Sequence, residues 1–176
     1  ASSTAHHRQP QSIHPPFGQS NPPTGTFFEV SSGAIHTCGI RSNGTKECWG
    51  DDTYGQINET PTDSNYIMVG GGENHICALD NDGVIECWGD DGLGQASEAP
   101  TESGYVQVSG GLFHSCALDN TGRIKFWGLP VDVQDPSGEG YIQITSGQFH
   151  NCALDSEGFI ECWGWDDYGQ VGDAPT

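Results

Sequence analysis

Apolar residues in this chain occur in short alternating runs that are separated by glycine-containing turns. A representative unit contains Ile67–Val69, His75–Leu79 and Val84–Trp88, with a turn signal at 81–83. Alternation over so few residues predicts β-strands, and the turn signal predicts a hairpin between the last two. We expect the outer members of the first run to face the core, and Ile85 and Cys87 to share a face opposite to Trp88. The pattern indicates no long helix.

The same unit recurs four times along the chain. The block H-x-C-[AG]-[LI] starts at His36, His75, His114 and His150, in steps of 39, 39 and 36 residues. Each block is followed by C-W-G, or by F-W-G in the third copy. Repeats of this length bury their apolar faces only against their neighbours. We therefore expect an all-β fold of four propeller-type repeats, at about 26–64, 65–103, 104–139 and 140–176, with its function on the surface of the array.

Residues 1–25 lack the repeat pattern and form a separate Pro/Ser-rich leader. Pro15-Pro16 and Pro22-Pro23 favour an extended, polyproline-type conformation. Phe17-Gly18-Gln19 echoes Tyr54-Gly55-Gln56 at the end of the first repeat. Two interpretations stay open, a flexible leader or a segment that supplies the closing part of a repeat.

The excess of acidic residues narrows the range of partners. The 176 residues contain 24 Asp and Glu against 5 Lys and Arg, a formal net charge of −19. Such a charge repels nucleic acid and anionic membrane surfaces, and no apolar run is long enough to cross a bilayer. We therefore expect neither nucleic-acid binding nor membrane insertion. The chain begins at Ala1 without a signal peptide, which we interpret as a processed or trimmed form.

Six of the seven cysteines form pairs with one common separation of ten residues. The pairs are Cys38 with Cys48, Cys77 with Cys87, and Cys152 with Cys162. A hairpin centred on the intervening glycine turn places the two members opposite each other, with Cα atoms about 4.5–5.5 Å apart. The spacing therefore predicts three disulfides within repeats and an oxidising, extracellular compartment. The alternative is that these are small core residues that stay reduced.

Cys116 lacks a partner because Phe126 occupies the equivalent position in the third repeat. It is either a buried free thiol packed against that ring or half of an intermolecular disulfide.

The repeat resembles the regulator of chromosome condensation family, whose blades form β-propellers. The residues that carry the resemblance are Gly72-x-x-His75-x-Cys77-Ala78-Leu79, Gly83-x-Ile85-x-Cys87-Trp88-Gly89 and Gly94-Gln95, with equivalents in the other repeats. The paired cysteines are similar to those of an extracellular branch that includes plant crinkly-type receptor ectodomains and a propeller-type β-lactamase inhibitor. The resemblance implies a ring of about seven blades, more than the four repeats present. The charge and the cysteine pairs argue against the chromatin binding and nucleotide exchange of the family's namesake.

Several polar residues are candidate ligands. Paired aspartates occur at Asp51-Asp52, Asp90-Asp91 and Asp166-Asp167, in loops that we take as equivalent. Calcium binds six to eight oxygen ligands, so acidic loops on one rim could hold it. The alternative is that each aspartate accepts hydrogen bonds from nearby backbone. The four repeat histidines lack metal-ligand spacing, so we expect hydrogen bonds within or between blades, and no other metal or cofactor.

Three further residues are candidates for surface roles. The sequons at Asn43 and Asn58 fall in a predicted hairpin tip and a predicted loop, where glycans attach if the host glycosylates. Each repeat also has one tryptophan at the same position, namely Trp49, Trp88, Trp127 and Trp163. Packing between repeats explains these tryptophans better than a sugar-stacking platform does. Trp165 lies outside that pattern, and we expect it to be an exposed contact residue.

The chain contains no nucleophile elbow, phosphate loop or dinucleotide fingerprint, so we expect no enzyme. Two functions remain for an extracellular non-catalytic protein. The first is a structural or assembly subunit of a surface filament or oligomer, completed by a neighbour's N-terminal leader, since open sheet edges invite pairing. The second is a soluble recognition module that binds a protein or glycan through its rim loops.

Overall fold

The computed structural model describes residues 22–129, 136 and 138–174, which fold into four three-stranded antiparallel sheets without a helix. Each sheet is called a blade here. Blade 1 contains β1 (Phe27–Ser32), β2 (His36–Arg41) and β3 (Lys46–Gly50); blade 2 contains β4 (Tyr66–Gly71), β5 (His75–Asp80) and β6 (Ile85–Gly89); blade 3 contains β7 (Tyr105–Gly110), β8 (His114–Asp119) and β9 (Ile124–Gly128); blade 4 contains β10 (Tyr141–Ser146), β11 (His150–Asp155) and β12 (Ile160–Gly164). The predicted all-β fold of four propeller-type repeats is confirmed. Most of the predicted leader, residues 1–21, lies outside the described residues.

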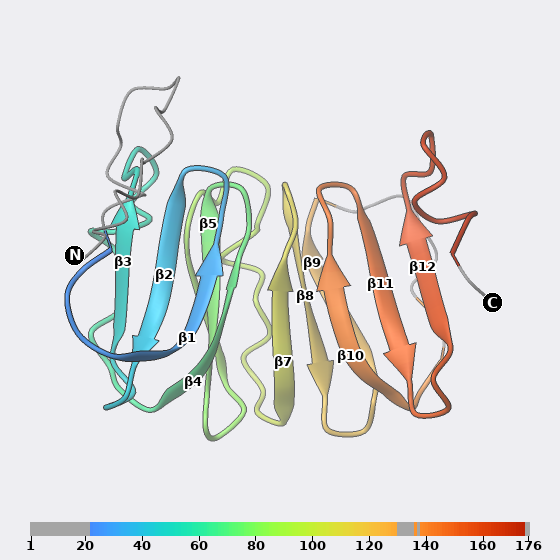
Figure 1. Ribbon diagram of the computed structural model, residues 1–176, viewed down its shortest axis with the longest axis horizontal. Helices are drawn as coiled ribbons and strands as arrows, with labels where there is room; N and C mark the ends of the chain where they lie inside the picture. Colours follow the sequence, from blue (N-terminus) through green and yellow to red (C-terminus); the bar gives the residue numbers. More distant parts are fainter. Residues whose placement is uncertain (1–21, 130–135, 137, 175–176) are drawn as a thin grey trace, which may run out of the picture.

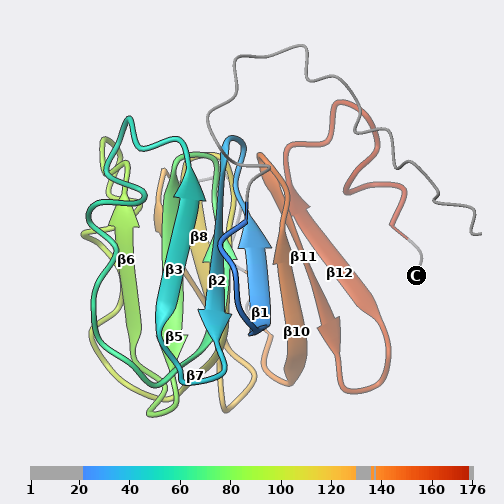
Figure 2. The ribbon, with the colours of Figure 1, turned by 60° about the vertical axis from the view of Figure 1, so that its left-hand side comes forward.

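The blades lie side by side in chain order, from blade 1 in blue to blade 4 in red (Figure 1). Neighbouring blades touch through β1 and β4, β4 and β7, and β7 and β10, and no comparable contact joins blade 4 to blade 1 within the described strands. The ends of these four inner strands converge around one hollow of about 300 Å³, which is lined at Ser32–Ala34, Gly71–Glu73, Gly110–Leu112 and Ser146–Gln148. The described blades therefore form an open arc around an axis, which the turned view also shows (Figure 2).

The inner strand of each blade contains one irregularity that corrects an expectation. The pairing of β4 with β5 shifts register between Tyr66 and Met68, and β1, β7 and β10 shift at the same place. A bulge of this kind inserts one unpaired residue and reverses the alternation that precedes it. Tyr66 and Val69 are consequently buried, whereas Ile67 is exposed. The expectation that both outer members of this run face the core was therefore wrong for the first member.

The hydrophobic core is divided among the junctions between blades. At the first junction, Cys38, Ile40 and Cys48 of blade 1 pack against a set from blade 2 that includes Val69 and Trp88. The second and third junctions repeat this arrangement. Ile85 and Cys87 contact blade 3, whereas Trp88 on the same strand contacts blade 1, so the predicted opposition of their faces is confirmed. Each blade thus has one apolar face for the preceding blade and one for the following blade.

The cysteine pairs lie in these cores as disulfides. Cys38–Cys48, Cys77–Cys87 and Cys152–Cys162 are each joined across a hairpin, with Cα atoms 4.1 Å apart. Cys116 is a buried free thiol opposite Phe126, with its Sγ 3.1 Å from Ser146 Oγ. Burial raises the pKa of the Cys116 thiol to about 12, so its reactive thiolate form is suppressed.

We expect Cys116 to be the single free thiol and to resist alkylation until the protein unfolds, because it is both buried and protonated. Labelling with iodoacetamide in native buffer and in urea, followed by non-reducing peptide mapping, measures both properties. Labelling of Cys116 in the native protein, a bond from Cys116 to another chain, or further free thiols would contradict this.

Candidate interaction surfaces

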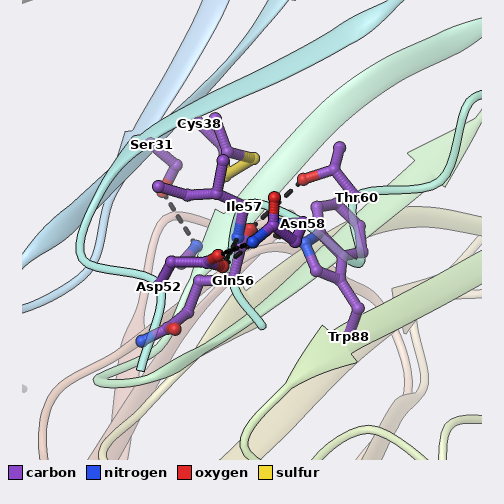
Figure 3. Close-up of a disulfide and its surroundings, with 10 residues drawn as sticks. Ser31, Cys38, Asp52, Gln56, Ile57, Asn58, Thr60 and Trp88 are labelled. Carbon is purple, nitrogen blue, oxygen red and sulfur yellow. Dashed lines mark hydrogen bonds between the residues drawn. A yellow bond between two sulfur atoms is a disulfide. The ribbon is translucent and has the colours of Figure 1, made fainter. Parts of the chain in front are cut away.

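Side-chain hydrogen bonds join the blades in addition to apolar packing. The indole of Trp88 donates from Nε1 to the main-chain oxygen of Gln56 in the loop of blade 1 at 3.0 Å, beside the Cys38 disulfide (Figure 3). Trp127 makes the same contact with Gln95 at 2.8 Å. These contacts fix the loop of one blade to the outer strand of the next, as expected if the repeated tryptophans serve packing.

A second group of hydrogen bonds reaches the inner strand of the following blade. Gln107 Nε2 donates to Ile144 O at 2.8 Å, and Ile144 N donates back to Gln107 Oε1 at 2.9 Å. Two residues along, Ser109 Oγ accepts from Ser146 N at 3.0 Å. The first junction contains the same serine contact, in which Ser31 Oγ accepts from the main-chain N–H of the second blade at 2.9 Å.

The repeat histidines provide a third contact across the junctions. His75 Nε2 lies 2.8 Å from Ser115 Oγ, and His114 Nε2 lies 2.9 Å from Asn151 Oδ1. At the equivalent position blade 2 has Ile76, and neither ring nitrogen of buried His36 has a hydrogen-bond partner among the described residues. Burial lowers the pKa of His36 and of His75 to about 4, so both rings are neutral at physiological pH. The histidines therefore serve structure at the junctions.

The free energy of unfolding is expected to fall as the pH decreases from about 6.5 to about 4. In this range His36 and His75 are protonated in the unfolded chain but stay neutral in the folded protein, where they are buried. Their folded-state pKa values lie below the unfolded value, so this contribution is present above pH 6.5 and is lost on acidification. Urea unfolding at pH 7 and pH 5 measures it. His36→Leu should reduce the difference between the free energies of unfolding at pH 7 and at pH 5. An unchanged difference would contradict the assignment of this effect to the buried histidines.

His75→Leu should reduce the pH dependence as well, and at pH 7 it is compared with His36→Leu because it also removes the histidine partner of the Ser115 hydroxyl. We expect it to cost about 1–3 kcal/mol at pH 7 through that buried unpaired group, whereas His36→Leu leaves no partner behind and should cost less.

The two ends of the arc expose the faces that the junctions bury. The N-terminal end face contains Phe27, Val30 and Trp49. Val30 is 61% exposed, whereas its equivalents Val69, Val108 and Ile144 are 2–4% exposed. Each of the three equivalents is covered by a preceding blade, whereas blade 1 has no preceding blade among the described residues.

The C-terminal end face contains Gln143, Thr145, Leu154, Ile160 and the Cys152–Cys162 disulfide. Ile160 is 42% exposed, compared with 6% for its equivalent Ile85. A hollow of about 190 Å³ opens between these side chains, at the position where the next blade packs in the other three blades.

The rim loops use their aspartates to hold the chain in place. Asp52 Oδ1 accepts from the main-chain N–H groups of two successive residues, and Asp91 and Asp166 make the same pair of contacts. Asp166 is therefore the equivalent of Asp52 and Asp91, and Trp165 stands where blades 1 and 2 have Asp51 and Asp90. The expectation that Asp166-Asp167 is equivalent to Asp51-Asp52 was therefore wrong by one residue.

These contacts leave the calcium candidates without a shared centre. Asp51 and Asp90 also accept hydrogen bonds within their own loops. No group of three or more His, Cys, Asp or Glu residues suited to a metal ion occurs in the part of the chain that the structure describes.

A cluster of aromatic side chains crosses one rim of blades 3 and 4. The rings of Phe113 and Phe149 lie 6.3 Å apart, Phe149 and Trp165 lie 5.8 Å apart, and Trp165 and Tyr168 lie 5.2 Å apart. Trp165 is 43% exposed and Tyr168 is 84% exposed. We call these four residues the rim aromatic cluster. Sequence reasoning found only Trp165, although Phe113 and Phe149 both directly precede a repeat histidine, a signal that could have marked them.

Both sequons are exposed, and their side chains have local partners. Asn43 Oδ1 accepts from Thr45 N and Oγ1 in the hairpin tip, and Asn58 Nδ2 donates to Asp52. Within the residues that the structure describes, no helix has the length and apolar character needed to span a membrane.

Comparison with known proteins matches two of the four repeats to a family. Residues 105–131 and 141–170 match the family described as Regulator of chromosome condensation (RCC1) repeat, which confirms the resemblance predicted from the sequence. The third and fourth repeats are thus similar to RCC1-type propeller repeats, and the fourth contains a disulfide. No curated protein sequence matches the chain.

Three solved structures illustrate the fold. The CRINKLY WD40 ectodomain of the receptor kinase ACR4 from Arabidopsis thaliana is 24% identical with a TM-score of 0.68, over 83% of this chain and 51% of that one. The ectodomain of the receptor kinase CR4 from Physcomitrella patens is 24% identical with a TM-score of 0.66, over 77% and 38%. Prp20p from Saccharomyces cerevisiae is 20% identical with a TM-score of 0.65, over 81% and 45%. The chain thus spans about half of these structures or less, and they share its fold.

Proposed function

We propose that this chain is an extracellular, non-catalytic structural protein that acts as a subunit of an oligomer or filament, in which blades of another chain complete its open arc. The observation that carries the proposal is the exposure of Val30 and Ile160 at the two ends, at positions that the internal junctions bury either fully or in part.

Both end faces are suited to blade packing and poorly suited to water. Burial of apolar surface contributes about 25 cal/mol per Å², so covering Phe27, Val30, Leu154 and Ile160 favours association. Terminal repeats that remain monomeric usually have a polar outer face, which neither end of the described arc has.

The extracellular location is supported by the disulfides. Three of the four blades contain a disulfide at the same place in the repeat. Such bonds form and persist in oxidising compartments and are rare in the cytosol and nucleus. The ACR4 and CR4 structures are ectodomains of receptor kinases. We propose a secreted or cell-surface protein, and the exposed Asn43 and Asn58 are the proposed positions of its glycans.

We expect the 176-residue protein to form oligomers at micromolar concentration, because two apolar faces per chain remain uncovered in the monomer. Light scattering after size exclusion, at about 0.15 M salt to screen the net charge of −19, measures the mass. A protein that stays monomeric at about 100 μM would contradict the assembly function. Deletion of residues 1–21 then tests whether the predicted leader is the completing segment, since loss of the oligomer in that variant alone would assign the contact to the leader.

A second candidate function is recognition of a protein or glycan, and the rim aromatic cluster favours it. Exposed tryptophan and tyrosine side chains are enriched at recognition surfaces because they offer large apolar contact area with a polar tip. The Saccharomyces cerevisiae Prp20p structure is described together with its binding to Gsp1p and histones, so an RCC1-type propeller can bind proteins.

For this second function we expect Trp165→Ala to weaken ligand binding about tenfold or more, because the substitution removes a central ring of the cluster. Labelled protein applied to a panel of immobilised glycans and extracellular proteins provides the measurement. Ile142→Ala is the control, since Ile142 is exposed on another surface. Equal binding by both variants, or no bound ligand in the panel, would contradict recognition through this rim.

A further inference from the structure

We infer that the partner chain is a second copy of this protein, whose blade 1 docks on blade 4 in the register of the internal junctions. This inference rests on the proposed assembly function and identifies its partner. The three polar contacts that cross junctions inside the chain have matching groups on the two end faces, which apolar exposure alone would not produce.

Blade 4 presents a complete set of the groups that reach forward to a following blade. Gln143 stands at the position of Gln107, Thr145 at that of Ser109, and His150 at that of His114. Blade 3 is the other blade with the complete set, and it makes all three contacts with blade 4. Blades 1 and 2 have only part of the set, because Glu29 and Met68 replace the glutamine. The end face of blade 4 therefore has the same polar groups as the face of blade 3 that forms all three contacts with blade 4.

Blade 1 presents the groups that receive these contacts. Val30 stands at the position of Ile144, whose main-chain N–H and C=O bind Gln107. Ser32 stands at the position of Ser146, whose N–H is bound by Ser109. Thr37 stands at the position of Ser115 and Asn151, and it supplies the hydroxyl that a histidine ring requires.

The apolar parts of the two faces also correspond. At the second junction, Leu79 and Ile85 of blade 2 pack against Tyr105 and Val108 of blade 3. In the proposed contact, Leu154 and Ile160 of blade 4 correspond to Leu79 and Ile85. Phe27 and Val30 of the second copy correspond to Tyr105 and Val108, and they fill the hollow of about 190 Å³ on blade 4.

The contact is head-to-tail, because each copy contributes one face of each kind. A contact of this type gives a ring if it closes and a filament if it does not. The chain superposes on about half of larger propellers, with 51% of the Arabidopsis thaliana structure covered. Two copies therefore suffice for a closed ring, and its eight blades lie within the usual range of about 4–8. We infer a dimer.

The first experiment measures mass by light scattering for three matched variants. Val30→Glu and Ile160→Glu each place a charge on one end face, at a side chain that is exposed in the single chain and tolerates the change. Ile142→Glu is the control, because its equivalents Ile67 and Val106 are exposed even where both neighbouring blades are present. We expect a dimer for the native protein and the control, and monomers for the other two variants. An equimolar mixture of these two should recover dimers, since each mixed pair retains one intact contact.

The second experiment tests the register with substitutions that remove polar contacts and keep the apolar faces. Gln143→Ala and Thr37→Val each remove groups assigned to the contact, and we expect each to raise the dissociation constant about three- to tenfold. Ser42→Ala, in the hairpin turn of blade 1, should leave it unchanged. Analytical ultracentrifugation provides the constants.

The outcomes separate this inference from the assembly function. If the native protein is monomeric, both fail. If Val30→Glu and Ile160→Glu each still form dimers, each end face pairs with its own kind and the head-to-tail contact is wrong, although assembly stands. If both give monomers but Gln143→Ala and Thr37→Val have no effect, the register is wrong and the faces meet in another way.

Discussion

Face-to-face packing of neighbouring blades is the interaction on which the rest of this structure depends. A three-stranded sheet is too thin to have an interior, so each apolar side chain is buried only when another sheet covers it. The disulfides, the tryptophans and the repeat histidines are accordingly found at the junctions, where they contribute covalent, apolar and hydrogen-bonding contacts to the same surface. The two end faces are exposed for the same reason, which is why the functional proposals concentrate there.

The loops at the rim obey a different constraint, the need to pair backbone groups without a sheet. Asp52, Asp91 and Asp166 each bind two N–H groups of their own loop, and this shapes three loops of similar course. The acidic composition thus contributes to loop structure. In blade 4 the other aspartate position is occupied by Trp165, and an ordinary structural loop becomes an aromatic surface at that point.

Local periodicity allowed much of the fold to be predicted from the sequence, including the strands, the cysteine pairing positions and the opposed faces of Ile85 and Trp88. These features depend on residues within about ten positions of each other. The bulge after Tyr66 escaped prediction because one unpaired residue leaves no mark in an alternating pattern. The partners of Gln107 and His114 escaped because they lie 37 residues away, on another blade. The end faces could be recognised only by comparison with the internal junctions, where those hydrogen bonds show which residues contact the neighbouring blade.

Lys46 makes the junction between blades 1 and 2 different from the other junctions. Lys46 is in blade 1, at the position where the other blades have isoleucine. Its ammonium group lies 3.3 Å from Glu86 Oε2 and 3.1 Å from the ring centroid of Tyr66, both of which belong to blade 2. In blade 3 the residue at the position of Glu86 is Lys125, which would repel Lys46. Near-identical repeats are prone to exchange partners while they fold. The buried ammonium group of Lys46 therefore favours the contact of blade 1 with blade 2 over a contact of blade 1 with blade 3.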